Sequence, residues 1–174
     1  MMRQGTKANR SGKTAENEVQ TILESNGYPF FKYRDFAKGK VDCSKYDKYV
    51  LTNVPYEKQF GRNKKGEKRI GRTEFLIVNK EGEEERYIRT EVRSQNVNGS
   101  VEEKLPNAIL NAINCFPEKE SILLLDGDGI SESTKEDIRK FAEEEIRLRN
   151  SEKSITIMNS MSELRKYVIN GLKQ

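Results

Sequence analysis

The segment RTEFLIVNKEGEEERYIRTEVRS, residues 72–94, holds two strand-like runs joined by a short turn. β-Branched, aromatic and other apolar side chains concentrate in residues 72–79 and 86–94, and a glycine lies in the charged stretch between them. This pattern predicts two paired antiparallel strands. Each strand is interrupted by an acidic residue, Glu74 in the first and Glu91 in the second. The segment therefore predicts neighbouring strands that both carry a carboxylate.

Further helices and strands are predicted on both sides of this hairpin. Apolar residues at helical spacing predict helices, and apolar runs bounded by turn residues predict strands. The predicted helices are residues 14–26, 100–115, 133–149 and 160–172, and the other predicted strands are residues 54–60, 121–126 and 154–158. Residues 28–53 show no clear period. The order αβββαβαβα predicts an α/β fold with a central mixed sheet flanked by helices.

Two local signals sharpen these assignments. Ser100 with Glu103, and Ser160 with Glu163, have the spacing of capping boxes and mark the starts of two helices. Residues 121–126, SILLLD, form an almost wholly apolar run, which is typical of a strand covered on both faces.

The chain length of 174 residues fits one domain. We expect a basic, flexible N-terminal arm over residues 1–13 and a single domain over residues 14–174. No apolar run reaches the roughly 20 residues that span a bilayer, and the N-terminal residues lack the apolar stretch of a secretory signal. These features favour a cytoplasmic protein without a membrane partner, in which the two cysteines are free thiols.

Histidine is absent from the chain. This excludes Ser-His-Asp and Cys-His catalysis as well as His-ligated zinc, and two cysteines are too few for a zinc cage. The chemistry must then come from carboxylates, Lys, Arg, Tyr, Ser or Thr. An oxygen-preferring metal would suit such a set.

Basic residues gather in two places although the net charge is only +4. Residues 1–13 contain four basic residues and no acid, and residues 61–72 contain six basic residues against Glu67 alone. Such clusters favour a polyphosphate partner, because binding releases its counterions. The predicted DNA-binding residues are Lys13, Arg62, Lys64, Lys65, Lys68, Arg69 and Arg72. The alternative is a pair of solvated, flexible basic loops.

The acids of the central hairpin have a neighbouring cation. In a strand, Glu91 and Arg93 point to the same face because side chains alternate. Two carboxylates and a cation on one face suit a metal-dependent phosphodiesterase, since carboxylates bind Mg²⁺ and a cation stabilises charge on the phosphate. The alternative is an exposed sheet face with cross-strand ion pairs.

The order of elements and the motifs together resemble the PD-(D/E)xK nuclease superfamily, in its bacterial and phage branch. There a D-F-L-I strand precedes an I-E-C-K-x-Q strand and a helix start S-G-S-V-D-E-K-x-P. The corresponding stretch here is GRTEFLIVNKEGEEERYIRTEVRSQNVNGSVEEKLPNAILNAI, residues 71–113, and its closest match is NGSVEEKLP, residues 98–106. The resemblance covers roughly residues 11–130.

The resemblance implies a Mg²⁺- or Mn²⁺-dependent DNA endonuclease of restriction, homing or phage type, without an organic cofactor. It implies metal binding by Glu74, Glu91 and the backbone carbonyl of Val92, with Glu16 supporting the metal or a water. Gln95 would orient the nucleophile or the DNA. Cleavage of both strands implies a homodimer, in the cytoplasm of a bacterial or phage-infected cell.

Two residues depart from the family pattern. Glu74 replaces the usual Asp, and Arg93 replaces the usual Lys. Arginine stays protonated and cannot act as a base, although it can hold the reacting phosphate. Lys104 is a candidate for the missing lysine. The alternative function is a catalytically inactive, nuclease-like module that only binds nucleic acid.

Overall fold

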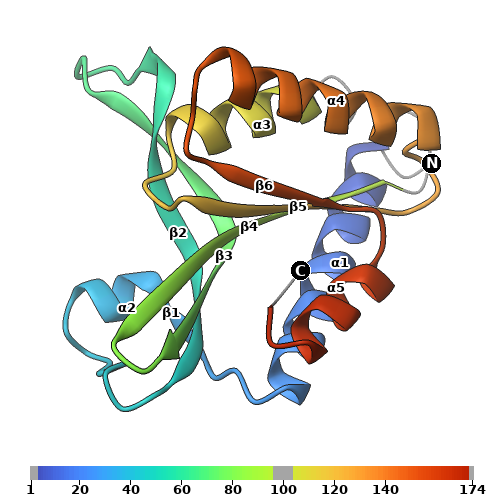
Figure 1. Ribbon diagram of the computed structural model, residues 1–174. Helices are drawn as coiled ribbons and strands as arrows, with labels where there is room; N and C mark the ends of the chain where they lie inside the picture. The colour runs from blue at the N-terminus through green and yellow to red at the C-terminus, as the bar shows by residue number, and fades with distance from the viewer. Residues whose placement is uncertain (1–3, 96–103, 173–174) are drawn as a thin grey trace.

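Six strands form one sheet in the order β1-β2-β3-β4-β5-β6, and helices cover both of its faces (Figure 1). The computed structural model describes residues 4–95 and 104–172, with side chains from residue 13 onwards. The elements are α1 (Gln4–Ser25), β1 (Phe30–Lys32), α2 (Tyr33–Ala37), β2 (Lys48–Arg62), β3 (Lys68–Glu81), β4 (Glu84–Ser94), α3 (Leu105–Asn114), β5 (Glu120–Asp126), α4 (Glu132–Leu148), β6 (Ser154–Met158) and α5 (Met161–Ile169). β2, β3 and β4 are antiparallel, whereas β1 is parallel to β2, and β5 is parallel to both β4 and β6. The predicted mixed α/β architecture is confirmed.

The apolar run of β5, which lies between β4 and β6, is buried on both faces, as predicted. Ile122 and Leu124 pack into the core beneath α1 and α5, whereas Leu123 and Leu125 pack into the core beneath α3 and α4. Full burial of each such side chain stabilises the fold by about 2 kcal/mol. Alternate side chains of β5 therefore pack against the helical layers on the two faces of the sheet.

Helix α1 packs through its apolar stripe of Ala15, Val19, Ile22 and Leu23. The helix begins at Gln4, ten residues before the predicted start at residue 14. Polar residues 4–13 supply no apolar stripe, but a helix nucleated by the buried part can propagate into them. Most of the predicted N-terminal arm is therefore helical, and its role as a separate binding element stays a prediction.

Capping boxes were predicted at the starts of two helices, α3 and α5. At α5, Ser160 Oγ accepts a hydrogen bond from the backbone N–H of Glu163 at 3.3 Å, which confirms that cap. The cap formed by Ser100 and Glu103, and most of the closest family match at residues 98–106, lie outside the described residues.

Cys43 and Cys115 are free, as expected. In the described part of the chain, no helix is long and apolar enough to cross a membrane.

Residues 28–53, which had no predicted structure, form β1, α2 and the start of β2. β1 has three residues and α2 has five, so neither is long enough to show a period. Aromatic contacts hold this segment on the sheet, with the ring of Phe31 5.2 Å from Tyr46 and the ring of Phe30 5.9 Å from Phe75. The segment forms the outer edge of the sheet next to β2.

Strands β3 and β4 separate part of the way along their length. Their paired residues run from Glu81↔Glu84 to Phe75↔Thr90, after which β3 continues beside β2, and β4 continues beside β5 from Glu91↔Leu123. We call the point of separation the fork. Beyond it, β2 and β3 project from the sheet as a hairpin (Figure 1).

The basic stretch of residues 61–72 lies on this hairpin rather than in a loop. Arg62 ends β2, residues 63–67 form the turn, and β3 begins at Lys68. Sequence reasoning placed a loop here because the side chains are polar. They are exposed on both faces of a two-stranded ribbon, so no apolar alternation marks the strands.

A buried ion pair connects the strands at the fork. Arg89 of β4 donates to both carboxylate oxygens of Glu118, at 2.6 and 2.7 Å, and its side chain is only 2% exposed. The same guanidinium reaches the carbonyls of Val54 and Pro55 and the hydroxyl of Thr73. One side chain thus links β4, β3, β2 and the loop before β5.

This connection predicts a large loss of stability in Glu118→Ala. The variant leaves a buried, unpaired guanidinium, which typically costs about 3–5 kcal/mol. Urea unfolding should show this loss, while Glu152→Ala, which removes an exposed ion pair with Lys119, should unfold like the wild type. Equal stability of the two variants would contradict the structural role of Arg89.

Candidate active site

The two predicted acids lie on either side of the fork. Glu74 is the residue of β3 just past the last pair with β4, and Glu91 is the equivalent residue of β4. Without a β3 carbonyl opposite it, the backbone N–H of Val92 donates to Glu74 Oε2 at 3.2 Å. The Glu74 side chain therefore takes the place of the interrupted strand pairing.

Arg93 brings the two acids together. Its Nη1 lies 3.6 Å from Glu74 Oε1, and its Nη2 lies 3.1 Å from Glu91 Oε2. Nη1 also donates to the carbonyl of Val92 at 3.1 Å. The carboxylates and the carbonyl that the family resemblance assigned to a metal thus converge on one cation, the guanidinium of Arg93.

This oxygen set has the chemistry of a Mg²⁺ or Mn²⁺ site. Carboxylate and carbonyl oxygens are the ligands that these hard ions prefer. Their convergence on a guanidinium shows that they can stabilise positive charge at one point. Among the described residues no group of three or more His, Cys, Asp or Glu side chains could hold a metal.

Burial dominates the electrostatics of the acid pair. It raises the pKa of Glu74 to about 7, with Arg93 opposing this shift and Glu91 adding to it. Burial also raises the pKa of Glu91, whereas the charges of Arg93, Arg89 and Lys58 lower it. The carboxyl group of Glu74 therefore titrates near neutral pH.

Glu16 lies near the first of these acids. It lines a pocket of about 260 Å³ together with Asn17 and Gln20 of α1, and Glu74 and Arg72 line the same pocket from β3. The stripe that buries Ala15 and Val19 leaves Glu16 at the edge of α1 facing this pocket. The structure thus brings three of the predicted site residues, Glu16, Glu74 and Arg72, to one place.

The other predicted catalytic residues are placed differently. Gln95 is buried just after β4, where its backbone N–H donates to the Asp126 carbonyl at 3.0 Å and its carbonyl accepts from Gly129 at 2.7 Å. Lys104 is exposed and precedes α3. Their predicted roles rest on the family resemblance.

The predicted DNA-binding residues lie on two elements. Lys13 is exposed on α1, and the others lie on the β2–β3 hairpin. Several of them are tied within the hairpin: Arg62 donates to the carbonyl of Gly66 at 2.6 Å, and Lys68 pairs with Glu57 at 3.3 Å. The hairpin thus presents a basic surface beyond the fork.

Three further residues near the acids, all on β2, were not among the predicted site residues. Burial raises the pKa of Tyr56 to about 12, and the charge of Glu91 adds to this shift. Lys58 affects the pKa of Glu91, as described above. Asn53 has a left-handed φ of 55° between residues paired with Phe75 and Thr73, and so lies across from Glu74. Neighbouring β-strand side chains alternate between faces, but the position of Tyr56 and Lys58 relative to Glu91 on β4 depends on the fold.

The sheet order and the fork define an α/β protein with a restriction-endonuclease-like core. Comparison with protein families matches residues 7–171 to the PD-(D/E)XK nuclease superfamily domain, so the chain belongs to that superfamily. The match includes Glu16, Glu74, Glu91 and Arg93 and extends beyond the predicted limits. No curated protein and no solved structure matches the chain.

The raised pKa of Glu74 predicts a pH-dependent stability. The folded carboxyl holds its proton more tightly than the unfolded one, whose ordinary value is 4.5, so its contribution is complete below about 4.5 and is lost as pH rises through about 7. Relative to Glu74→Gln, the wild type should lose up to about 3 kcal/mol of unfolding free energy between pH 5 and pH 8. Urea unfolding in EDTA measures this difference, with Glu152→Gln as an exposed control. A pH-independent difference would show that Glu74 is not desolvated.

Proposed function

We propose that the chain is a Mg²⁺- or Mn²⁺-dependent DNA endonuclease that hydrolyses phosphodiester bonds. The observation that carries this proposal is the convergence of Glu74, Glu91 and the Val92 carbonyl on one cation at the fork. The chain's membership of a nuclease superfamily supports the same reaction and a nucleic-acid substrate.

Glu74, Glu91 and the carbonyl of Val92 would hold the metal, and Glu16 would assist from α1. The bound ion supplies Lewis-acid activation of the phosphate and lowers the pKa of water. The residues around the site maintain its low polarity: Tyr56 stays neutral, and burial of both acids strengthens their attraction for a cation.

Arg93 has two tasks in this proposal. Without a metal, its guanidinium neutralises the two buried acids. If a metal took that place, the guanidinium would be free to hold the reacting phosphate, which suits its forked donors but not proton abstraction. Lys104 and Lys58 are then the lysines available to take the missing role. The charge of Lys58 lowers the pKa of Glu91, so both lysines are to be tested.

Gln95 is proposed to orient the nucleophile or the DNA from the end of β4. Its backbone is fixed by the turn between β5 and α4, through Asp126 and Gly129. A side chain on so firmly held a backbone can position a partner with little loss of entropy.

The β2–β3 hairpin and Lys13 would bind the DNA backbone. Two-stranded ribbons fit a DNA groove, and the basic side chains of this one are exposed. Phe60, 77% exposed, and Ile70 add apolar surface beside those charges. Cleavage of both strands would use a homodimer with one acid pair for each strand. We place this activity in the cytoplasm of a bacterial or phage-infected cell.

A second candidate is a nucleic-acid-binding module without catalysis. The observation that favours it is Arg93 itself, which replaces the family's lysine and pairs with both acids. A guanidinium that never leaves the acids would prevent metal binding. DNA binding without cleavage at any Mg²⁺ or Mn²⁺ concentration would support this alternative.

The acid pair can be tested by cleavage of plasmid DNA. Glu74→Ala and Glu91→Ala should each lower the single-turnover rate by at least about 10²-fold, since each removes a group that stabilises charge in the transition state. Both should still bind DNA in EDTA, and circular dichroism checks that they are folded. Glu144→Ala, an exposed residue of α4, is the control. Wild-type cleavage by either acid variant would reject this active site.

The hairpin can be tested by the salt dependence of DNA binding. Replacing Lys64, Lys65, Lys68 and Arg69 by Gln should weaken binding and reduce the log–log salt slope by up to about 3.6, at about 0.9 for each lost phosphate contact. The control is the same number of exposed charges elsewhere, at Lys119, Lys140, Arg147 and Lys166. An equal effect of both sets would mean that the hairpin makes no specific phosphate contacts.

A further inference from the structure

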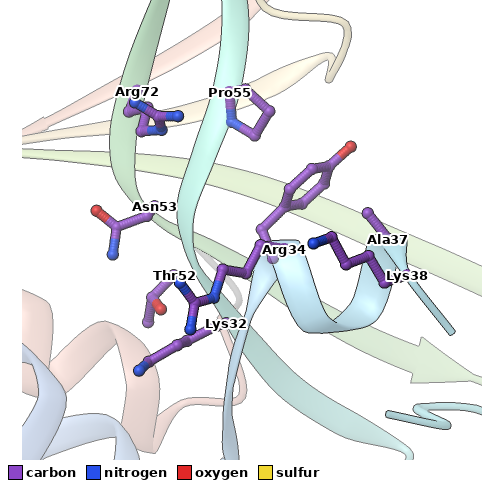
Figure 2. Close-up of a pocket in the computed structure, with 9 residues that line it drawn as sticks. Lys32, Arg34, Ala37, Lys38, Thr52, Asn53, Pro55 and Arg72 are labelled. Carbon is purple, nitrogen blue, oxygen red and sulfur yellow. The ribbon is translucent and has the colours of Figure 1, made fainter. Parts of the chain in front are cut away.

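A second pocket opens on the other side of Arg72, between α2 and the middle of β2 (Figure 2). Its volume is about 670 Å³, within the range of ligand-binding cavities. Of the described residues that line it, four are cationic and none is acidic; the cations are Lys32, Arg34, Lys38 and Arg72. All charged side chains in this described lining are therefore positive.

Core packing does not explain these charges. Helix α2 has no buried residue, so Arg34 and its neighbours on this helix are not held there by the core. Arg34 contacts Asp35 of its own helix at 3.6 Å, but this acid does not line the pocket. Like charges around one cavity repel each other, and a bound anion would remove that cost.

The pocket adjoins the proposed active site. Thr52, Asn53 and Arg72 line it, and the same three residues line the pocket that contains Glu16 and Glu74. Figure 2 shows Asn53 between Arg72 and Thr52, with the charged ends of Lys32 and Arg34 near Thr52. A strand whose phosphate lies at the acids can thus continue directly into the cationic pocket.

The shared wall is conformationally unusual. Asn53 adopts a φ of 55° within β2, a conformation that costs energy for residues other than glycine and is least unfavourable for asparagine. The side chain of Asn53 is exposed at the junction of the two pockets. Its amide can bond a phosphate oxygen or sugar hydroxyl passing between them.

We infer that this pocket binds the backbone phosphates of the nucleic-acid strand that flank the bond cleaved at Glu74 and Glu91. The inference rests on the proposed function and assigns a binding role to β1 and α2. A duplex or single strand supplies several phosphates in a row, which fits four cations spread over one cavity better than a single small anion does.

The test compares two triple variants of the full chain. Lys32→Gln with Arg34→Gln and Lys38→Gln removes three pocket cations, and Lys40→Gln with Lys45→Gln and Lys119→Gln removes three exposed cations that do not line the pocket. All six side chains are exposed, so both variants should fold. Fluorescence anisotropy with a 30-base-pair duplex in EDTA measures binding without cleavage.

The pocket variant should bind the duplex at least about tenfold more weakly than the control, with a salt slope smaller by up to about 2.7. Equal affinity and slope in the two variants would overturn the inference. A second result would also overturn it: the wild type binds inorganic phosphate or a mononucleotide tightly, while the pocket variant keeps full DNA affinity. The ligand of the pocket would then be a small anion. The assay needs no cleavage, so it separates the two proposals. If the wild type never cuts DNA but the pocket variant loses binding, the nuclease proposal is rejected and the role of the pocket in DNA binding is retained.

Discussion

Two carboxylates buried at the separation of two strands are the constraint on which the rest of the structure depends. Glu74 and Glu91 are 20% and 5% exposed, and such groups, when ionised, require a nearby positive charge. Arg93 supplies it by contacting both acids and the carbonyl of Val92. Removing a partner from a buried pair usually costs about 3–5 kcal/mol, so Arg93 stabilises these acids when they are ionised.

The fork at which these acids lie is bridged by buried polar contacts. Glu74 satisfies the Val92 N–H that strand pairing would otherwise have bonded. Arg89 fixes β2 and β3 to β4 below the fork. The hairpin lies beyond the fork, and the cationic pocket lies beside it. Arg72 of β3 lines this pocket. One strand separation thus positions the acids and both basic surfaces.

Most of the fold could be predicted because long elements have a clear period. The acids stood out in β3 and β4 as interruptions of apolar strands, and the alternation of Glu91 with Arg93 placed the cation on the same face. β1 and α2 were missed because three- and five-residue elements are shorter than the patterns that identify them. The pocket that they build was therefore missed as well.

The remaining details depended on contacts between distant residues. No local signal distinguishes Lys58 from other lysines of the basic hairpin, and its effect on the pKa of Glu91 depends on the fold. The left-handed Asn53 was equally hidden, since asparagine is common in turns and β2 continues through it. The pairing of Arg93 with both acids could be recognised only from the geometry of the fork, because the sequence does not show where β3 and β4 separate.

The central claim is that Arg93 occupies the place of a metal ion between Glu74 and Glu91. A Mn²⁺ titration followed by electron paramagnetic resonance tests it directly in the wild type, Arg93→Ala and Glu91→Gln. Because Arg93 competes for the same oxygens, Arg93→Ala should bind Mn²⁺ about tenfold more tightly or better, a gain of at least about 1.4 kcal/mol, whereas Glu91→Gln should lose the site. Unchanged or weaker Mn²⁺ binding by a folded Arg93→Ala variant would contradict the account.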